Sequence, residues 1–234
     1  HFILSMNGFR CEFLLKDNPQ FRKYFWIILL IECVWFALVS SVPASQNSIE
    51  QSVFRITNYQ QSPDWKSPWK MKPTSQGLGS GFLIHDNWIL TNAHVVSDSR
   101  MLLVNKISSP KPFLADVLAI AHDSDLALLK VRDPKFYQGL TPLELGGIPE
   151  LRSRVRAYGY PVGGKELSRT EGVVSRIEFG TYVHPGIDSH LLIQTDSAIN
   201  PGNSGGPVTQ SGQAIGVAFQ SNLRLNDVGY FIPV

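Results

Sequence analysis

Short apolar runs broken by turn residues fill the chain from Gly79 onward. His85-Asp86-Asn87 and Ser211-Gly212 stand where hairpin turns are expected. A βαβ arrangement requires an amphipathic helix of about 10–15 residues between strands, and no such stretch separates these runs. The pattern therefore predicts an all-β fold of antiparallel barrels or a sandwich. The runs predict strands at Ser80–Ile84, Trp88–Leu90, Met101–Asn105, Leu114–Ala121, Leu126–Val131, Arg154–Tyr160, Gly172–Glu178, Leu191–Thr195, Pro207–Gln210, Ala214–Phe219 and Gly229–Pro233.

The residues before this region are more polar and contain Pro63, Pro68 and Pro73. Within them, Ser52–Thr57 predicts one strand, and Tyr59–Leu78 predicts a long loop. We therefore expect a leader over residues 1–44, a polar segment with one strand and a long loop over residues 45–78, and a folded domain over residues 79–234.

The leader has the features of an export signal. Arg22 and Lys23 precede an apolar run over residues 25–39, which only Glu32 interrupts, and the small residue Ala44 follows. The run has 15 residues, whereas a membrane-spanning helix needs about 20. We predict a secretory signal peptide, with an uncleaved membrane anchor and a buried core segment as the alternatives.

Composition excludes several classes of function. Hydrophobic residues make up 43% of the chain and charged residues 17%, which is typical of a globular protein with a core. The net charge of +2 is spread along the chain, so nothing indicates nucleic-acid binding. The two cysteines, Cys11 and Cys33, both lie in the leader, and the six histidines form no His-Glu-x-x-His pattern. We expect no disulfide in the folded domain, no metal and no cofactor.

The segment Asn200–Pro207 carries the clearest chemical signal. A serine hydroxyl becomes a good nucleophile only when a base removes its proton and donors stabilise the resulting oxyanion. The glycines around Ser204 allow a tight turn that directs backbone N–H groups into one space. We assign Gly202, Asn203 and Ser204 to an oxyanion hole, with the N–H groups of Gly202 and Ser204 as donors; the alternative is a glycine-rich turn with an exposed serine.

A serine of this kind needs a histidine base, and a carboxylate must orient that base. His94 follows an apolar run and begins a short helical turn. Asp116, Asp123 and Asp125 are the candidates for the carboxylate. Asp125 directly precedes the apolar run Leu126–Val131, so it is expected to be desolvated and fixed, whereas Asp123 is expected to cap a turn.

The chain order His94, Asp125, Ser204 is that of chymotrypsin-like enzymes. Together with the segments TNAHVV, HDSDLALLK and NPGNSGGP, it resembles the HtrA/Deg serine proteases from about Ser52 to the last residue. GSGFLI before the histidine and IGVAFQ after the serine extend the resemblance. Three motifs in the correct order make this match far more specific than any one of them.

The resemblance implies a chymotrypsin-like pair of six-stranded antiparallel β-barrels, over about residues 52–145 and 150–234, with the site between them. His94 and Asp125 then belong to the first barrel and Ser204 to the second. Ile215–Gln220 is expected to be the edge strand that pairs with an extended substrate. Counted back from the serine, Ala198 falls at the base of the primary pocket, and with Ile199 and Phe219 it implies a small apolar pocket.

The activity implied is that of a serine endopeptidase that acts on unfolded or damaged proteins and peptides. The compartment implied is the bacterial periplasm, or the inner membrane if residues 25–39 anchor the chain. A homotrimer is common in the family, and a PDZ domain usually follows the protease domain; here the sequence ends at Val234, as either a fragment or a form without that domain. A non-catalytic chaperone or peptide-binding protein, and a narrow-specificity protease of the same fold, are the alternatives.

Overall fold

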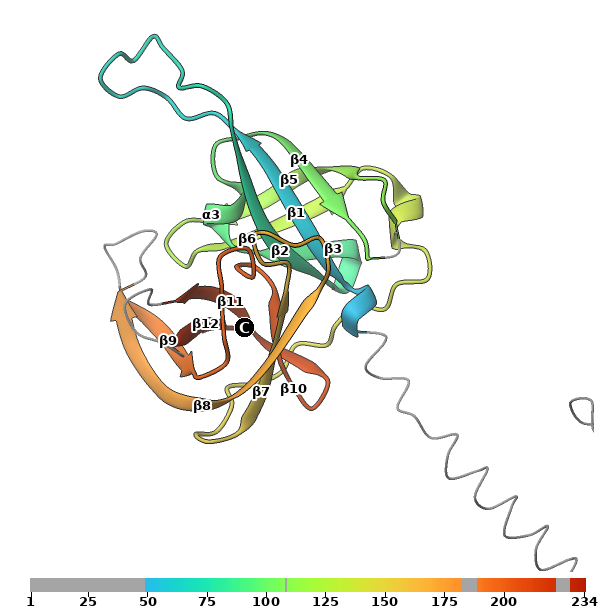
Figure 1. Ribbon diagram of the computed structural model, residues 1–234, viewed down its shortest axis with the longest axis vertical. Helices are drawn as coiled ribbons and strands as arrows, with labels where there is room; N and C mark the ends of the chain where they lie inside the picture. The colour runs from blue at the N-terminus through green and yellow to red at the C-terminus, as the bar shows by residue number, and fades with distance from the viewer. Residues whose placement is uncertain (1–48, 108, 182–188, 222–227) are drawn as a thin grey trace, which may run out of the picture. The chain divides into compact units, whose positions relative to one another are not determined.

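The computed structural model describes residues 49–107, 109–181, 189–221 and 228–234, and in them the strands close into two antiparallel barrels (Figure 1). Short helical segments at His85–Asn87 and Ala93–Val96 (α3) connect strands of the first barrel, and a third at Pro134–Tyr137 follows the last strand of that barrel in the chain. The first barrel runs in the order β1 (Val53–Gln60), β2 (Ser75–Ile84), β3 (Trp88–Thr91), β6 (Leu126–Val131), β5 (Phe113–Ala121) and β4 (Ser99–Asn105). The second runs in the order β10 (Pro207–Gln210), β11 (Gln213–Ser221), β12 (Gly229–Pro233), β9 (Ser189–Thr195), β8 (Ser168–Thr181) and β7 (Arg154–Gly159).

Alternating apolar positions fill each barrel because successive strand residues point to opposite faces. In β6, Ala127, Leu129 and Val131 are buried in the first barrel, and Phe136 joins the same core. A second core lies inside the other barrel. A third apolar cluster joins the two, since it contains Phe82 of β2 and Val217 of β11. This contact fixes one barrel against the other and so positions a site between them.

The predicted all-β double barrel is confirmed, but the predicted loop from Tyr59 to Leu78 is too long. β1 continues to Gln60, which pairs with Ser75 at the start of β2. The connecting segment is therefore residues 61–74, and β1 and β2 both belong to the first barrel. The apolar pattern is weak here because this end of the β1–β2 ladder carries polar residues and glycine, with Gly77 opposite Asn58.

The leader over residues 1–44 lies outside the described residues, so the expected signal or anchor helix over residues 25–39 is not assessed. Within the described part of the chain, no helix is both long enough and apolar enough to cross a membrane.

Candidate active site

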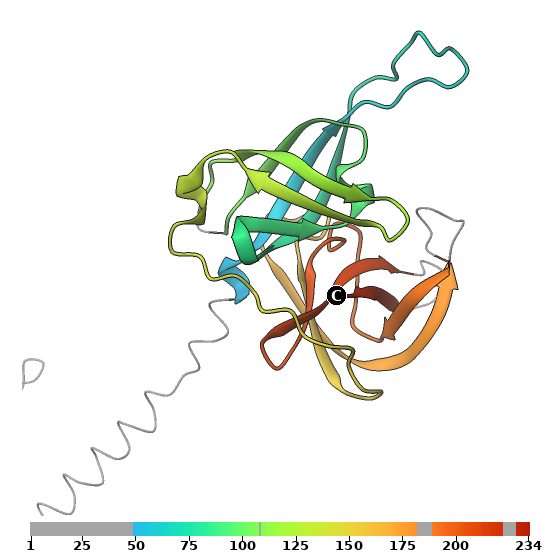
Figure 2. The same ribbon diagram turned by 180° about the vertical axis from the view of Figure 1, so that it is seen from behind.

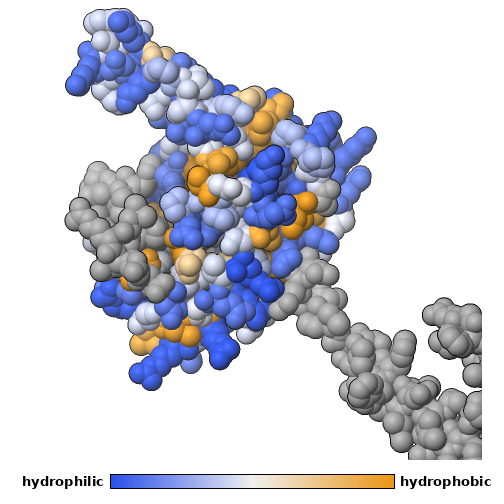
Figure 3. All heavy atoms as spheres, in the orientation of Figure 1, coloured by the Kyte–Doolittle hydropathy of each residue, from blue (hydrophilic) through white to orange (hydrophobic). Residues whose placement is uncertain are grey.

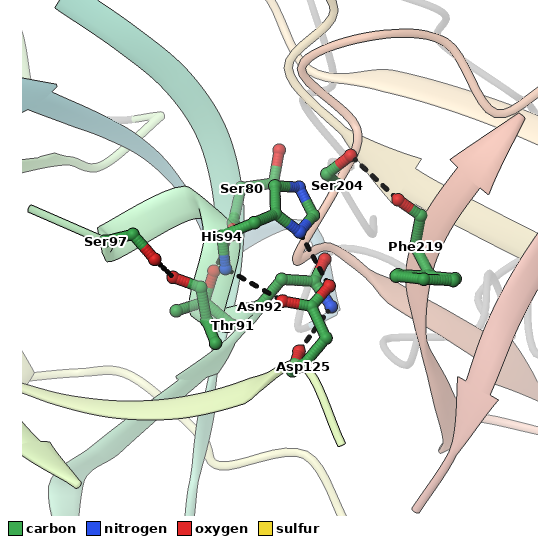
Figure 4. Close-up of polar contacts among 9 residues, drawn as sticks. Ser80, Thr91, Asn92, His94, Ser97, Asp125, Ser204 and Phe219 are labelled. Carbon is green, nitrogen blue, oxygen red and sulfur yellow. Dashed lines mark hydrogen bonds and ion pairs between the residues drawn. The ribbon is translucent and has the colours of Figure 1, made fainter. Parts of the chain in front are cut away.

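His94 and Asp125 are held together by two neighbouring strands of the first barrel. β3 pairs with β6 at Thr91 and Ala127, so the residues just after β3 lie beside the residue just before β6. The Asp125 side chain accepts two hydrogen bonds from His94: Oδ2 from Nδ1 at 2.6 Å and Oδ1 from the backbone N–H at 2.8 Å (Figure 4). The carboxylate thereby fixes both the ring and the backbone of the histidine.

The backbone of Asp125 is fixed as well. Its carbonyl oxygen accepts hydrogen bonds from the Ala93 N–H at 3.1 Å and from Asn92 Nδ2 at 3.0 Å. Asp125 is fully buried and has a left-handed φ of 51°, a conformation that aspartate tolerates better than most residues. The competing carboxylates lie elsewhere: Asp123 is exposed, and Asp116 is paired with Arg132 at 2.7 Å.

This geometry selects the tautomer of His94. A buried carboxylate that accepts from Nδ1 keeps the proton on that nitrogen, and the lone pair then resides on Nε2. The His94 side chain keeps 31% of its surface exposed, whereas that of Asp125 keeps none. The pair therefore combines a partly exposed imidazole with a fully buried carboxylate that holds it in place.

Ser204 lies in the loop between β9 and β10 of the second barrel, next to this pair. Its hydroxyl donates to the carbonyl oxygen of Phe219 at 3.2 Å. The Phe219 ring meets the His94 ring edge-on, with 6.4 Å between the ring centroids. Figure 4 shows the serine between the histidine and Phe219. The structure thus brings His94, Asp125 and Ser204 together at the junction of the barrels.

Two peptide units of the Ser204 loop are oriented by hydrogen bonds to their carbonyl oxygens. The Pro201 oxygen accepts from the Val162 N–H at 2.9 Å, and the Asn203 oxygen accepts from the Gly206 N–H at 2.9 Å. The Pro201 oxygen shares a peptide unit with the Gly202 N–H, and the Asn203 oxygen shares one with the Ser204 N–H. In a trans peptide the C=O and N–H point in opposite directions, so these two N–H groups point away from Val162 and Gly206 respectively. Neither donates a hydrogen bond to another residue of the described chain.

Asn203 has a different position from the one expected. Its N–H donates to the Asn200 carbonyl oxygen at 2.9 Å, and the residue is buried. Its backbone therefore shapes the turn and is not a donor for an oxyanion. Gly202 beside it has a φ of 98°, and a Cβ there would overlap the Tyr160 carbonyl oxygen, so only glycine fits.

Sequence reasoning missed Ser80, a buried residue of β2 that contacts this loop with both its backbone and its side chain. The Ser80 N–H donates to the Ser204 carbonyl oxygen at 2.8 Å, and its hydroxyl donates to the Gly202 carbonyl oxygen at 2.7 Å. The same hydroxyl accepts from the Tyr160 N–H at 2.9 Å. Its own carbonyl oxygen accepts from the Thr91 hydroxyl at 2.7 Å. The only signal in the sequence is a small polar residue between Gly79 and Gly81.

The residues predicted for the primary pocket do not line one open pocket. Ala198 is exposed, but Ile199 packs in the core of the second barrel and Phe219 packs against Leu192 and Ile232, each with 3% of its surface exposed. Ile199 therefore does not line an open pocket, because the barrel core takes its side chain. Phe219 lies beside the histidine instead. Of the three, only Ala198 has a side chain that a substrate can reach in the described structure.

The predicted edge strand is also shorter than expected. β11 pairs with β10 up to Val217 and with β12 on its other side. The next residue, Ala218, exchanges backbone hydrogen bonds with Gly205 and Gly206 at 2.8 Å. Residues 219–221 are thus the part of β11 that extends past the end of β10, and residues 215–218 are internal to the barrel.

Comparison with known proteins places the chain in a family. A family model described as a trypsin-like peptidase domain matches residues 79–217, more than half of the chain. Protease Do-like 4 of Arabidopsis thaliana, named as mitochondrial, is 46% identical over 182 residues, which are 78% of this chain and 35% of that protein. A serine protease DegP homolog of Plasmodium falciparum is 40% identical over 171 residues, 73% of this chain and 20% of that protein.

The chain belongs to the HtrA/Deg type of trypsin-like peptidases. It spans well under half the length of these HtrA/Deg relatives. Among solved structures, the active form of a protease from M. tuberculosis superposes with a TM-score of 0.67 at 24% identity, over 82% of this chain and 79% of that one. This likeness supports the double-barrel fold.

Proposed function

We propose that this HtrA/Deg-type domain is a serine endopeptidase in which His94, Asp125 and Ser204 form the catalytic triad. The observation that carries the proposal is the pair of hydrogen bonds from His94 to the buried Asp125. Next to this pair lies Ser204, in a loop where the N–H groups of Gly202 and Ser204 donate to no other described residue. An oriented imidazole, a hydroxyl and two backbone donors are the groups that acyl transfer requires.

The reaction begins with a movement of the Ser204 hydroxyl. In this structure it donates to the Phe219 oxygen at 3.2 Å, and a rotation about its Cα–Cβ bond redirects it to His94 Nε2. Nε2 takes the hydroxyl proton as Oγ attacks the substrate carbonyl carbon. The N–H groups of Gly202 and Ser204 stabilise the oxyanion, and Asp125 stabilises the imidazolium.

The protonated His94 then gives its proton to the leaving amine, and an acyl-enzyme remains on Ser204. A water molecule that loses its proton to Nε2 hydrolyses this ester, which releases the second product and restores the hydroxyl. Each proton taken by Nε2 is returned within the cycle, so the reaction needs no cofactor.

The preferred substrates are extended chains of unfolded or damaged proteins. Residues 219–221 of β11 extend past β10, and an extended substrate can add to them as a strand. A substrate N–H that bonds to the Phe219 oxygen displaces the Ser204 hydroxyl from it, which favours rotation towards His94. A folded substrate has its backbone groups already paired and cannot bind in this way.

The test of the triad is Ser204→Ala in the full chain. Wild-type protein is expected to hydrolyse casein and to react covalently with a fluorophosphonate probe, whereas the variant should do neither and should keep the same thermal unfolding temperature. The matched control is Ser211→Ala, at an exposed turn between β10 and β11, which should behave as wild type. Casein hydrolysis and labelling by the Ser204→Ala variant at wild-type rates would exclude Ser204 as the nucleophile.

The compartment and assembly of the protein are separate proposals. The leader supports export to the bacterial periplasm, with anchoring of residues 25–39 in the inner membrane as the alternative. The mitochondrial name of Do-like 4 favours an organelle as a second candidate. N-terminal sequencing of the mature protein tests the leader, since export with cleavage gives a new N-terminus near Ser45. Sedimentation of the same protein tests the homotrimer that the family resemblance implies.

A further inference from the structure

The segment that connects β1 and β2, residues 61–74, projects from the first barrel. Both ribbon views show it reaching away from the strands (Figures 1 and 2), and the space-filling view shows it standing clear of the barrel surface (Figure 3). We call residues 61–74 the projecting hairpin. It contains none of the triad residues, and it plays no part in the proposed reaction.

Hydrogen bonds give the tip of the projecting hairpin a defined shape. The Asp64 N–H donates to the Lys70 carbonyl oxygen at 3.0 Å, and the Ser67 N–H donates to that of Asp64 at 2.9 Å. The Lys70 N–H in turn donates to the Ser67 carbonyl oxygen at 2.7 Å. A bridge between Pro63 and Met71 closes the base of the tip. Its side chains are therefore presented from a folded turn.

Two tryptophans occupy this tip, and both are exposed. Trp65 and Trp69 each keep 82% of their surface accessible. Tryptophan carries one of the largest apolar surfaces of any residue, and transfer of that surface out of water is favourable. Exposed apolar side chains that are grouped on a folded turn mark an interaction site, because a binding partner would remove them from water.

The charges around these rings are mostly positive. Lys66, Lys70 and Lys72 are exposed on the projecting hairpin, and its one acidic residue is Asp64. The Asp64 Oδ1 accepts the backbone N–H of Lys66 at 3.0 Å, so this carboxylate is engaged within the turn. The tip thus combines amphipathic aromatic rings with an excess of cations.

An anionic bilayer surface fits this combination better than a protein does. A stable protein interface needs about 800 Å² on each partner and a matching shape, whereas a narrow convex tip offers little area. A bilayer interface needs no matching pocket, it is the region where tryptophan is enriched, and its anionic headgroups attract lysine. The tip therefore has the chemistry of a peripheral membrane contact.

We propose that the projecting hairpin docks the domain on anionic lipid bilayers, with Trp65 and Trp69 inserted at the headgroup level and Lys66, Lys70 and Lys72 bound to lipid phosphates. This inference does not depend on the proposed protease activity. Docking at this point leaves the rest of the first barrel and the whole second barrel in the aqueous phase.

The test uses the full chain and vesicles of phosphatidylcholine alone or with about 30% phosphatidylglycerol. Because the leader can bind lipid by itself, the readout must come from the hairpin. Cys11 and Cys33 are changed to serine, and an environment-sensitive NBD probe is attached to a Ser67→Cys variant. The matched control carries the probe on a Ser211→Cys variant, at an exposed turn of the second barrel. We expect the Ser67 probe to shift to the blue on anionic vesicles and the Ser211 probe to stay unchanged.

Two further variants separate the two parts of the tip. Trp65→Ser with Trp69→Ser should abolish the shift of the Ser67 probe at lipid concentrations that saturate the parent. Changing the three lysines to glutamine should weaken binding to anionic vesicles by about 100-fold, at about fivefold per lysine. The thermal unfolding temperature should be unchanged in both, which shows that the domain is folded without reference to the proposed activity. Hydrolysis of a soluble peptide should be unchanged as well.

The proposal is overturned if the Ser67 probe does not respond to anionic vesicles while the chain sediments with them, because the leader then accounts for binding. It is equally overturned if the tryptophan variant keeps the probe shift. A fall in sedimentation coefficient in the tryptophan variant without lipid, with no probe response, would identify the tip as a contact between copies of the chain.

Discussion

The hydroxyl of Ser80 donates to the carbonyl oxygen of Gly202 at 2.7 Å, although the two residues are 122 positions apart in the chain. One belongs to the first barrel and the other to the loop that carries Ser204. The Gly202 peptide is held from its other end by the Asn203–Asn200 hydrogen bond. The shape of the loop that bears the nucleophile in the second barrel is thus set partly by a strand of the first.

Ser80→Ala should therefore lower kcat by about tenfold or more with little change in KM, because the loop loses the partner that fixes Gly202. A displacement of about 1 Å in such a site costs on the order of 100-fold. A peptide boronate, which mimics the tetrahedral intermediate, should lose more affinity than a substrate-like peptide. These constants are measured by steady-state kinetics and inhibition.

The control for this variant is Ser52→Ala. Ser52 is also fully buried, and its hydroxyl donates to the Thr141 carbonyl oxygen at 2.6 Å, away from the triad. Loss of a buried hydrogen bond destabilises a protein by about 1–3 kcal/mol, so both variants should unfold at lower temperature. Only Ser80→Ala should lose activity; equal kcat losses would reduce the role of Ser80 to stability.

Asp125→Asn should lower kcat by about 10⁴-fold, because an amide cannot hold the His94 tautomer or stabilise the imidazolium. Asp123→Asn, two residues away and exposed, should keep nearly full activity. Peptide hydrolysis near neutral pH measures both. Comparable losses in the two variants would mean that the orienting carboxylate has been assigned incorrectly.

Cleavage should follow small or medium aliphatic residues. Ala198 is exposed and uncharged, so the pocket that it is expected to line cannot pair with a basic side chain, whereas burial of an aliphatic side chain contributes about 1.5–3 kcal/mol. Mass spectrometry of the fragments of a denatured protein identifies the cut sites. A majority of cuts after Lys, Arg or Glu would contradict this pocket and leave the triad assignment intact.

The stability of the domain should fall in alkaline solution through Tyr160. Burial raises the pKa of Tyr160 from its ordinary value of 10.0 to about 12. Between these two values the unfolded chain loses the phenolic proton while the folded chain keeps it, so the free energy of unfolding decreases as pH rises. The urea midpoint should drop between about pH 10 and 12, and the drop should be smaller in Tyr160→Phe. Parallel curves for the two proteins would exclude this residue as the cause.

Much of this architecture is predictable from local pattern. Strands such as β6 and β10 appear in the sequence with their observed bounds, because turn residues flank each short run. His94, Asp125 and Ser204 are also recognisable, since each lies in a motif whose neighbours explain its chemistry. These features depend on residues that are close in sequence.

What the sequence could not supply depends on contacts between distant segments. Ser80 is one small polar residue among glycines, and its role exists only because Gly202 and Tyr160 fold against it. Ile199 looks like a pocket residue by its distance from Ser204, but the second barrel takes its side chain into the core. The ends of β1 and β2 were missed because polar residues and glycine pair there without an apolar pattern.

Closure of the second barrel has a consequence for the timing of activity during synthesis. β12, at Gly229–Pro233, pairs with both β9 and β11 and so completes the barrel that supports Ser204. A ribosome that has made the first barrel has already produced the His94–Asp125 pair, but the nucleophile has no complete scaffold until the final strand emerges. The nascent polypeptide is therefore expected to cleave neither other proteins nor itself until almost all of the residues described here have been translated.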